Sequence, residues 1–159
     1  RMMIASSNVQ SFDADPAMQA KAIMAKVLAA VLAKKHDFIA VNFANADMVG
    51  HTGNLQAAMQ AVRVLDGCLA RLVDGVLAAS GQMIITADHG NVEAMLEPSG
   101  EIDTEHSSSP VPFLVARKGA SFRLKPKGKL ADVAPTVLAL MNRPQPSSMT
   151  GHSLIMPSP

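Results

Sequence analysis

The sequence contains no tryptophan and no tyrosine, and its 5 phenylalanines leave aromatic residues at 3% of the 159 positions. Lys and Arg never occur more than two in a row. The chain therefore lacks the aromatic stacking platforms and basic stretches that are typical of nucleic-acid-binding proteins. Its apolar runs are also far shorter than the roughly 20 residues that a transmembrane helix needs. We expect neither a nucleic acid nor a membrane as a partner.

Cysteine and charged residues are also scarce. Cys68 is the single cysteine, which excludes an internal disulfide framework and favours a reducing, cytoplasmic location. Charged residues make up 17% of the chain and the formal net charge is +1, while 48% of residues are hydrophobic. This balance is opposite to that of disordered chains and supplies enough apolar material for a core. We expect residues 1–159 to form part of one domain without an internal boundary.

The first residue is Arg1, and no signal-peptide pattern of basic, apolar and small residues follows it. Because an open reading frame does not begin with arginine, we expect the chain to be a fragment or processed product of a longer protein.

The hydrophobic pattern predicts alternating helices and strands. Apolar residues recur every three or four positions between 54 and 79, which predicts a long amphipathic helix with Asn54 as its N-cap and Gly81 at its end. Short apolar runs predict strands buried on both faces. The expected elements are a helix from Asp15–Pro16 to 34, strands at 37–43, 83–87 and 111–116, loops at 44–53 and 88–110, and a helix from Asp132 to 141. This alternation predicts an α/β fold with a largely parallel sheet.

Acidic and histidine side chains collect at the predicted strand ends, where α/β sheets bind ligands. Asp47 and His51 follow the first strand, Asp88 and His89 follow the second, and His106 precedes the third. Carboxylate and imidazole groups suit Mn²⁺, Mg²⁺, Co²⁺ or Zn²⁺. Singly, each motif is more typical of a turn; together they favour a centre of two ions sharing a cleft.

Neighbouring polar residues have simpler interpretations. Glu93 and Glu105 are interpreted as solvated side chains rather than partners of metal ligands. Asn45 and Asn91 could either orient ligands or form turns, and His152 is interpreted as structural.

At these residues the sequence resembles the cofactor-independent phosphoglycerate mutases of the alkaline phosphatase superfamily. The most specific string is Asp47-Met48-Val49-Gly50-His51-Thr52-Gly53. The resemblance also covers Thr86–Asn91, His106 with Pro110–Phe113, Phe12–Pro16, Lys129–Thr136 and Met149–Ile155. It departs from the family at Ser107–Ser109, Ala17 and Gln19, positions that concern local hydrogen bonding and include none of the candidate metal ligands.

The resemblance implies a three-layer αβα fold and a role in glycolysis and gluconeogenesis. The implied reaction interconverts 3-phosphoglycerate and 2-phosphoglycerate through a phosphoserine intermediate. It uses two divalent ions, Mn²⁺ in most members, and no organic cofactor. By motif match, Asp47, His51 and His106 would hold the first ion, and Asp88 and His89 would help to hold the second.

The family's nucleophilic serine, a further aspartate ligand and the arginine-rich substrate domain match nothing in these residues. The resemblance therefore implies the C-terminal part of a phosphatase-like domain with an incomplete fold and no catalytic residue of its own. Its partners would be the missing N-terminal part and, in the intact enzyme, phosphoglycerate; alone it would be inactive. The alternatives are another phosphomutase or phosphatase of the superfamily, or a non-catalytic metal-binding module.

Overall fold

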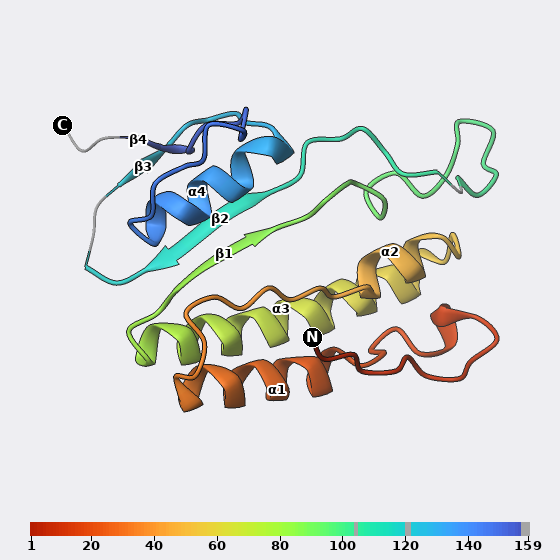
Figure 1. Ribbon diagram of the computed structural model, residues 1–159. Helices are drawn as coiled ribbons and strands as arrows, with labels where there is room; N and C mark the ends of the chain where they lie inside the picture. The colour runs from red at the N-terminus through yellow and green to blue at the C-terminus, as the bar shows by residue number, and fades with distance from the viewer. Residues whose placement is uncertain (104, 120–121, 157–159) are drawn as a thin grey trace. The chain divides into compact units, whose positions relative to one another are not determined.

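The computed structural model describes residues 1–103, 105–119 and 122–156. The chain divides into two compact units, Arg1–Ala116 and Arg117–Pro159. The helices and strands, in chain order, are η1 Phe12–Ala14, α1 Ala20–Ala33, α2 Asn45–Gly50, α3 Leu55–Ala78, β1 Gln82–Thr86, β2 Phe113–Arg117, β3 Arg123–Leu124, η2 Leu130–Asp132, α4 Val133–Leu140 and β4 Ile155–Met156 (Figure 1).

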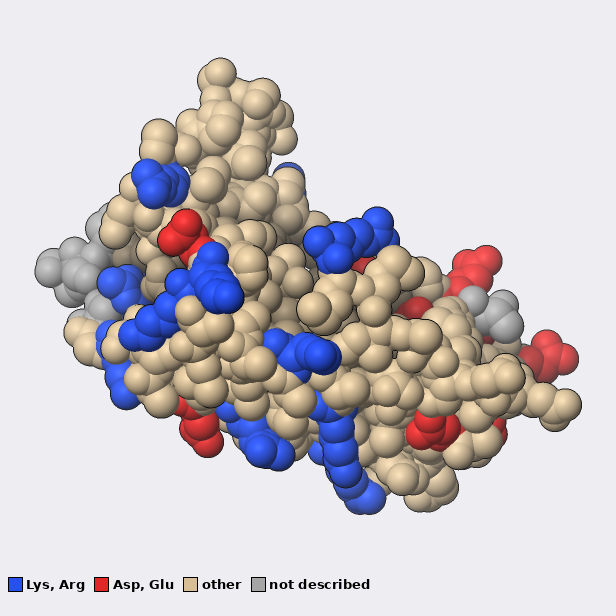
Figure 2. All heavy atoms as spheres, turned by 60° about the horizontal axis from the view of Figure 1, so that its bottom comes forward, with Lys and Arg blue, Asp and Glu red and all other residues tan. Residues whose placement is uncertain are grey.

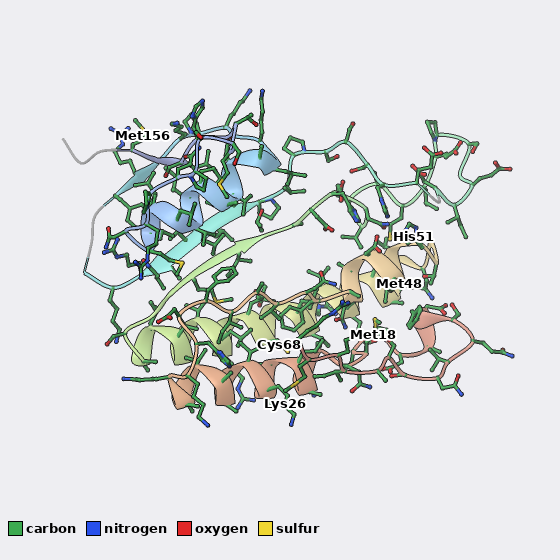
Figure 3. The ribbon with its side chains drawn as sticks, viewed as in Figure 1. Met18, Lys26, Met48, His51, Cys68 and Met156 are labelled. Atoms are coloured by element: carbon green, nitrogen blue, oxygen red, sulfur yellow. The ribbon has the colours of Figure 1, made fainter. Side chains whose placement is uncertain are left out.

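The first unit is built on the packing of α1 against α3, which lie side by side in Figure 1. Ala20 and Met24 of α1 are buried against Cys68 and Leu72 of α3, and Met83 of β1 packs on the same cluster. Figure 3 places the label of Cys68 between the two helices, as expected for a buried thiol that acts as a small apolar residue. Helices therefore cover one side of β1, and the predicted α/β class is confirmed.

The outer face of this helix pair carries charge. Lys21 and Lys26 on α1 and Arg63 and Arg71 on α3 are exposed. Figure 2, which brings the bottom of Figure 1 forward, shows Lys and Arg side chains separated by uncharged surface. The exposed surface of the two helices is nevertheless mixed, because Leu32 of α1 and Leu55 and Val62 of α3 are also exposed.

The long helix begins and ends close to the predicted positions. Asn54 is its N-cap, and the Asn54 side-chain oxygen accepts a hydrogen bond from the Ala57 N–H at 3.2 Å. The left-handed residue after the helix is Ser80, with φ 62°, while the Gly81 N–H donates to the Val76 carbonyl at 2.8 Å. Gly81 therefore follows the helix end rather than making the turn.

The first helix starts later than predicted. Asp15 accepts a hydrogen bond from the Met18 N–H at 3.2 Å, and Met18 adopts φ 41°, so residues 15–18 form a turn. Asp15 caps this turn instead of the helix, and α1 begins at Ala20.

The predicted buried strand at 37–43 is wrong. This stretch has no regular structure, and its Phe38 and Val41 side chains are 58% and 40% exposed. A strand needs a neighbour to pair its N–H and C=O groups, and none of the described strands pairs with this segment.

The expected parallel order is also not found among the described strand pairs. β1 neighbours β2, and their arrows point in opposite directions in Figure 1. The chain joins them by a loop, whereas parallel neighbours need a crossover connection, usually a helix. In the second unit β3 and β4 are antiparallel, with Leu124 opposite Ile155.

The prediction that residues 1–159 contain no domain boundary stays a prediction.

The second unit is organised by α4. Thr136 is fully buried, and its hydroxyl donates to the Asp132 carbonyl at 2.7 Å and accepts from the Leu154 N–H at 2.9 Å. Asp132 is the N-cap residue of α4, and its carboxylate accepts from the N–H groups of Lys129 and His152, both at 2.8 Å. These bonds lower the pKa of Asp132, the His152 contact being the larger cause. Asp132 thus joins the chain before α4 to the chain before β4.

Candidate metal centre

The short helix α2 replaces the loop predicted at 44–53 and carries two of the candidate ligands. Residues four apart lie on one helical face, and His51 Nε2 is 3.2 Å from Asp47 Oδ1. Figure 3 shows His51 at the end of α2 that leads into α3. The sequence left open whether a helical turn or a tight loop brings Asp47 and His51 together, and the structure shows a helix.

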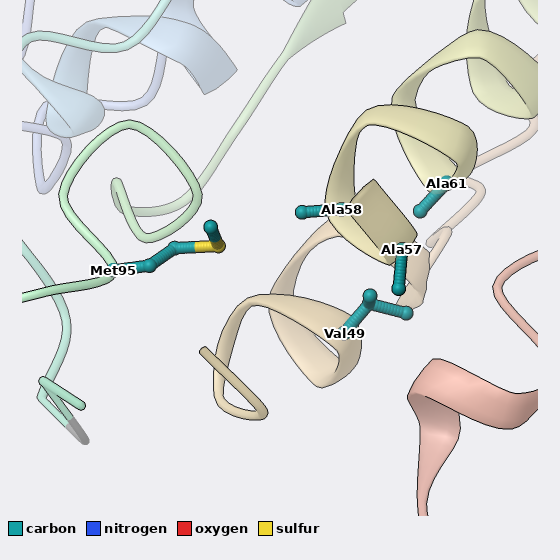
Figure 4. Packing of buried hydrophobic residues seen from close by; sticks show 5 residues of the cluster. All are labelled: Val49, Ala57, Ala58, Ala61 and Met95. Atoms are coloured by element: carbon teal, nitrogen blue, oxygen red, sulfur yellow. The ribbon is translucent and has the colours of Figure 1, made fainter. Parts of the chain in front are cut away.

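Two contacts fix α2 in place. The buried Asn45 side chain donates to the carbonyls of Pro16 and Ala17 at 2.9 and 2.8 Å. Val49 packs in a cluster with small residues of α3 and with Met95, as Figure 4 shows; the members are Val49, Ala57, Ala58, Ala61 and Met95. Alanine at the α3 positions lets α2 approach closely. Asn45 thus anchors α2 to residues 16 and 17, a role different from the two that the sequence left open.

His106 reaches the same carboxylate from a distant part of the chain. Its Nε2 lies 3.3 Å from Asp47 Oδ1. The segment after it is held to the loop after β1 by an antiparallel bridge, in which the Ser107 N–H donates to the Gly90 carbonyl at 3.0 Å. The three residues that the sequence assigned to a first ion are thus brought together.

These three side chains could hold a metal ion. One potential ligand atom from each of Asp47, His51 and His106 lies within 4.8 Å of the others. A carboxylate and two imidazoles fit the chemistry of Mn²⁺, Zn²⁺ or Co²⁺. The donor set therefore fits the implied ion, and the ligand role stays a prediction.

The pair assigned to a second ion lies next to this group but is more open. His89 Nε2 is 3.7 Å from Asp88 Oδ1, and the Asp88 side chain is 83% exposed. The His89 ring stacks on the His106 ring with 3.6 Å between centroids, while His51 and His106 are 5.2 Å apart. The two sets of candidate ligands therefore adjoin through the His89–His106 contact.

Asn91 is a site residue whose role the sequence left open. Its side chain is buried at 7% exposure, and Nδ2 donates to Asp47 Oδ1 at 3.0 Å and lies 3.3 Å from His51 Nε2. Gly50 makes this approach possible, because a Cβ there would lie 1.9 Å from Asn91 Oδ1. Asn91 thus orients the candidate ligand Asp47. In the sequence, its place in the family-like string Thr86–Asn91 was what indicated a role.

Glu93 is not the isolated solvated carboxylate that the sequence suggested. It is exposed, yet its carboxylate accepts hydrogen bonds from the Ser107 hydroxyl and from the Asn91 N–H, the latter at 2.9 Å. These bonds, that from Ser107 first, lower the pKa of Glu93 to about 2. Its partner lies 14 residues away, so no local pattern could reveal the contact. Glu105 is exposed, and its N–H donates to Asp103 at 2.8 Å.

Comparisons with known proteins agree with the resemblance seen in the sequence. The chain is 46% identical over 157 residues to a 2,3-bisphosphoglycerate-independent phosphoglycerate mutase of Clostridioides difficile, and 42% identical over 166 residues to one of Trichormus variabilis. The alignments cover 98% and 99% of this chain but 31% of each relative. The chain therefore spans about a third of the length of these curated relatives.

A solved structure shows the same fold. A crystal structure of Leishmania mexicana phosphoglycerate mutase at low cobalt concentration matches with a TM-score of 0.86 and 32% identity, over 96% of this chain and 31% of that one. This match confirms the expected fold class as part of a larger fold. Among the described residues, no helix is both long and apolar enough to cross a membrane.

The family assignment rests on most of the chain. The family model described as Metalloenzyme superfamily matches residues 1–145, which include every candidate ligand on α2 and in the loops around β1 and β2. The chain belongs to the metalloenzyme superfamily.

Proposed function

We propose that this chain is the metal-binding part of a phosphoglycerate mutase, and that the whole protein interconverts 3-phosphoglycerate and 2-phosphoglycerate in glycolysis and gluconeogenesis. The observation that carries the proposal is the convergence of Asp47, His51 and His106. These residues lie in strings that resemble the family, and the relatives that align with the chain are mutases by name. The buried free thiol of Cys68 suits the cytoplasm, where we place the protein.

In this proposal Asp47, His51 and His106 hold one divalent ion, and Asp88 and His89 help to hold a second. The ion is Mn²⁺, with Mg²⁺, Co²⁺ and Zn²⁺ as the alternatives that the same donor set accepts. When bound, such ions neutralise phosphate charge and lower the pKa of a nearby hydroxyl nucleophile. No organic cofactor is part of the proposal.

The chain's own residues contribute positioning and charge. His51 and His106 each present Nε2 to the same oxygen of Asp47, and Asn91 donates to that oxygen from the loop after β1. The carboxylate is thereby held toward both imidazoles before any ligand arrives, which reduces the cost of ordering the site on binding. The serine nucleophile and the substrate-binding arginines come, in this proposal, from the part of the mutase that the chain does not span. The chain alone is then inactive.

A chimera tests the proposal. The matching third of the Clostridioides difficile relative is replaced by this chain, and conversion of 3-phosphoglycerate to 2-phosphoglycerate is measured with Mn²⁺ present. We expect activity that is lost on Asp47→Ala and kept on Asp74→Ala, an exposed carboxylate of α3. A folded chimera that binds Mn²⁺ but acts on other phosphate esters favours another superfamily enzyme. One that binds Mn²⁺ and acts on nothing favours a non-catalytic module.

A further inference from the structure

His106 is the candidate ligand that depends most on long-range contacts. Asp47 lies in the short helix α2 and His51 is its C-cap residue, whereas His106 is exposed and lies on a segment with no helix or strand of its own. For His106 to lie close to Asp47, residues 105–109 must therefore be held against the loop after β1.

The Glu93 carboxylate adds a side-chain connection to the backbone bridge between Ser107 and Gly90. One of its oxygens accepts from the Ser107 hydroxyl, and the other accepts from the Asn91 N–H at 2.9 Å. The Ser107 hydroxyl also accepts from the Ser109 N–H at 3.2 Å, which turns the chain just after His106. A single carboxylate thus joins the residue next to His106 to the residue that orients Asp47.

Gly90 leaves the space in which this connection forms. A Cβ at position 90 would lie 2.1 Å from Glu93 Oε1 and 2.3 Å from the Ser107 hydroxyl oxygen. Glycine is required here for close approach and not for an unusual φ, because Gly90 is absent from the positive-φ residues of the described chain. Any side chain at this position would separate the carboxylate from the hydroxyl.

The charge state of Glu93 suits the same role. Its ordinary pKa of 4.5 already leaves the carboxylate ionised at neutral pH, and the Ser107 hydroxyl, as the largest cause, lowers this pKa to about 2. Hydrogen bonds to an ionised acceptor are about twice as strong as those between neutral groups. The bonds that Glu93 accepts are therefore charge-assisted.

We propose that Glu93 and Ser107 form a latch that positions His106 for ion binding and ties it, through Asn91, to Asp47. Glu93 is a positioning residue and does not itself contact the ion. The inference rests on the proposed function, in which Asp47, His51 and His106 hold a divalent ion.

The test measures Mn²⁺ affinity by calorimetry on the 159-residue chain and its variants. We expect Glu93→Ala and Ser107→Ala each to weaken binding by about 10–100-fold, the usual cost of losing a group that orients a ligand. Ser107→Thr keeps a hydroxyl and should restore affinity to within a few fold of the original. Because the two groups act as one unit, the double variant should lose little more than either single variant. The control is Glu97→Ala, an exposed carboxylate of the same loop.

A second measurement does not depend on the metal. The Ser107 N–H donates to the Gly90 carbonyl, so its hydrogen exchange without metal reports whether the segment after His106 stays in place. We expect Glu93→Ala to speed this exchange and Glu97→Ala to leave it unchanged. Unchanged exchange and affinity in Glu93→Ala would overturn the latch, as would fully additive losses in the double variant. If the unaltered chain binds no Mn²⁺ while Glu93→Ala still speeds exchange, the contact holds His106 in place but the metal role proposed for this chain fails.

Discussion

At the scale of single residues, one oxygen atom organises the candidate site. Asp47 Oδ1 lies 3.2 Å from His51 Nε2, 3.3 Å from His106 Nε2 and 3.0 Å from Asn91 Nδ2. The Asn91 amide can only donate through this nitrogen, so it holds the carboxylate whatever the protonation of the imidazoles. A cation that binds between the imidazoles would contact a carboxylate whose orientation is already fixed.

The lowered pKa of Glu93 predicts a contribution to stability that depends on pH. Its pKa in the folded chain is about 2, against an ordinary value of 4.5. A depressed pKa gives stability that is present above the ordinary value and is lost as pH falls toward the folded value. The loss should therefore fall between about pH 4.5 and pH 2.

Urea unfolding of the chain and of Glu93→Gln, followed by circular dichroism at pH 6 and pH 3, tests this. We expect the free energy of unfolding of the variant to lie below that of the original chain at pH 6, and the gap to narrow at pH 3. A gap that stays constant or widens on acidification would show that Glu93 is not held as an ionised acceptor.

The candidate ligands could be predicted from the sequence, but the contacts that position them could not. Asp47, His51 and His106 could be named because acidic and histidine residues collect at the predicted strand ends, and the resemblance then assigned these three to one ion. The contact of Asn91 with Asp47 spans 44 residues and that of Glu93 with Ser107 spans 14. Such contacts depend on how loops meet in space, and the sequence around each residue carries no signal of its distant partner.

At the scale of elements, α3 was predictable and the segment before α2 was not. The helical period of α3 runs over many turns and its N-cap is local, so both its start and its length follow from neighbouring residues. The apolar run at 37–43 is short and has no helical period. A strand forms only when another strand pairs with it, and the run itself does not show whether such a strand is present. Phe38 and Val41 are accordingly exposed in a segment that its composition alone would bury.

Two glycines in α3 give a matched prediction. A Cβ at Gly67 would meet nothing within 4 Å, whereas a Cβ at Gly75 would lie 2.4 Å from Leu28 Cδ2 in α1. Alanine is favoured over glycine in a helix interior by roughly 0.8–1 kcal/mol. We expect Gly67→Ala to raise the free energy of unfolding by about that amount, and Gly75→Ala to raise it less or to lower it because Leu28 must move.

Chemical denaturation of both variants in the same buffer measures the difference. A Gly75→Ala variant as stable as Gly67→Ala, or more so, would contradict the close packing of α1 on α3.

At the scale of the whole molecule, the candidate site lies entirely within the unit Arg1–Ala116. Its ligands come from α2 and from the loop between β1 and β2, and α3 supports α2 through small side chains. The α/β class could be predicted from the alternation of helical and strand patterns. The direction of the strands could not, because it depends on the path of the chain between β1 and β2. Binding of an ion should stabilise this unit, by about 2.7 kcal/mol at a free concentration one hundred times the Kd.

We propose that Asp47, His51 and His106 together hold one divalent ion. Calorimetric titration of the metal-free chain with Mn²⁺, beside Asp47→Ala and the exposed-carboxylate control Asp74→Ala, tests it most directly. We expect saturable binding of about one ion per chain, weakened more than 100-fold by Asp47→Ala, since losing a ligand should exceed the 10–100-fold cost of losing its support. The control should bind as the original chain does. If the original chain shows no saturable binding, or if Asp47→Ala binds equally well, the three residues do not form an ion site.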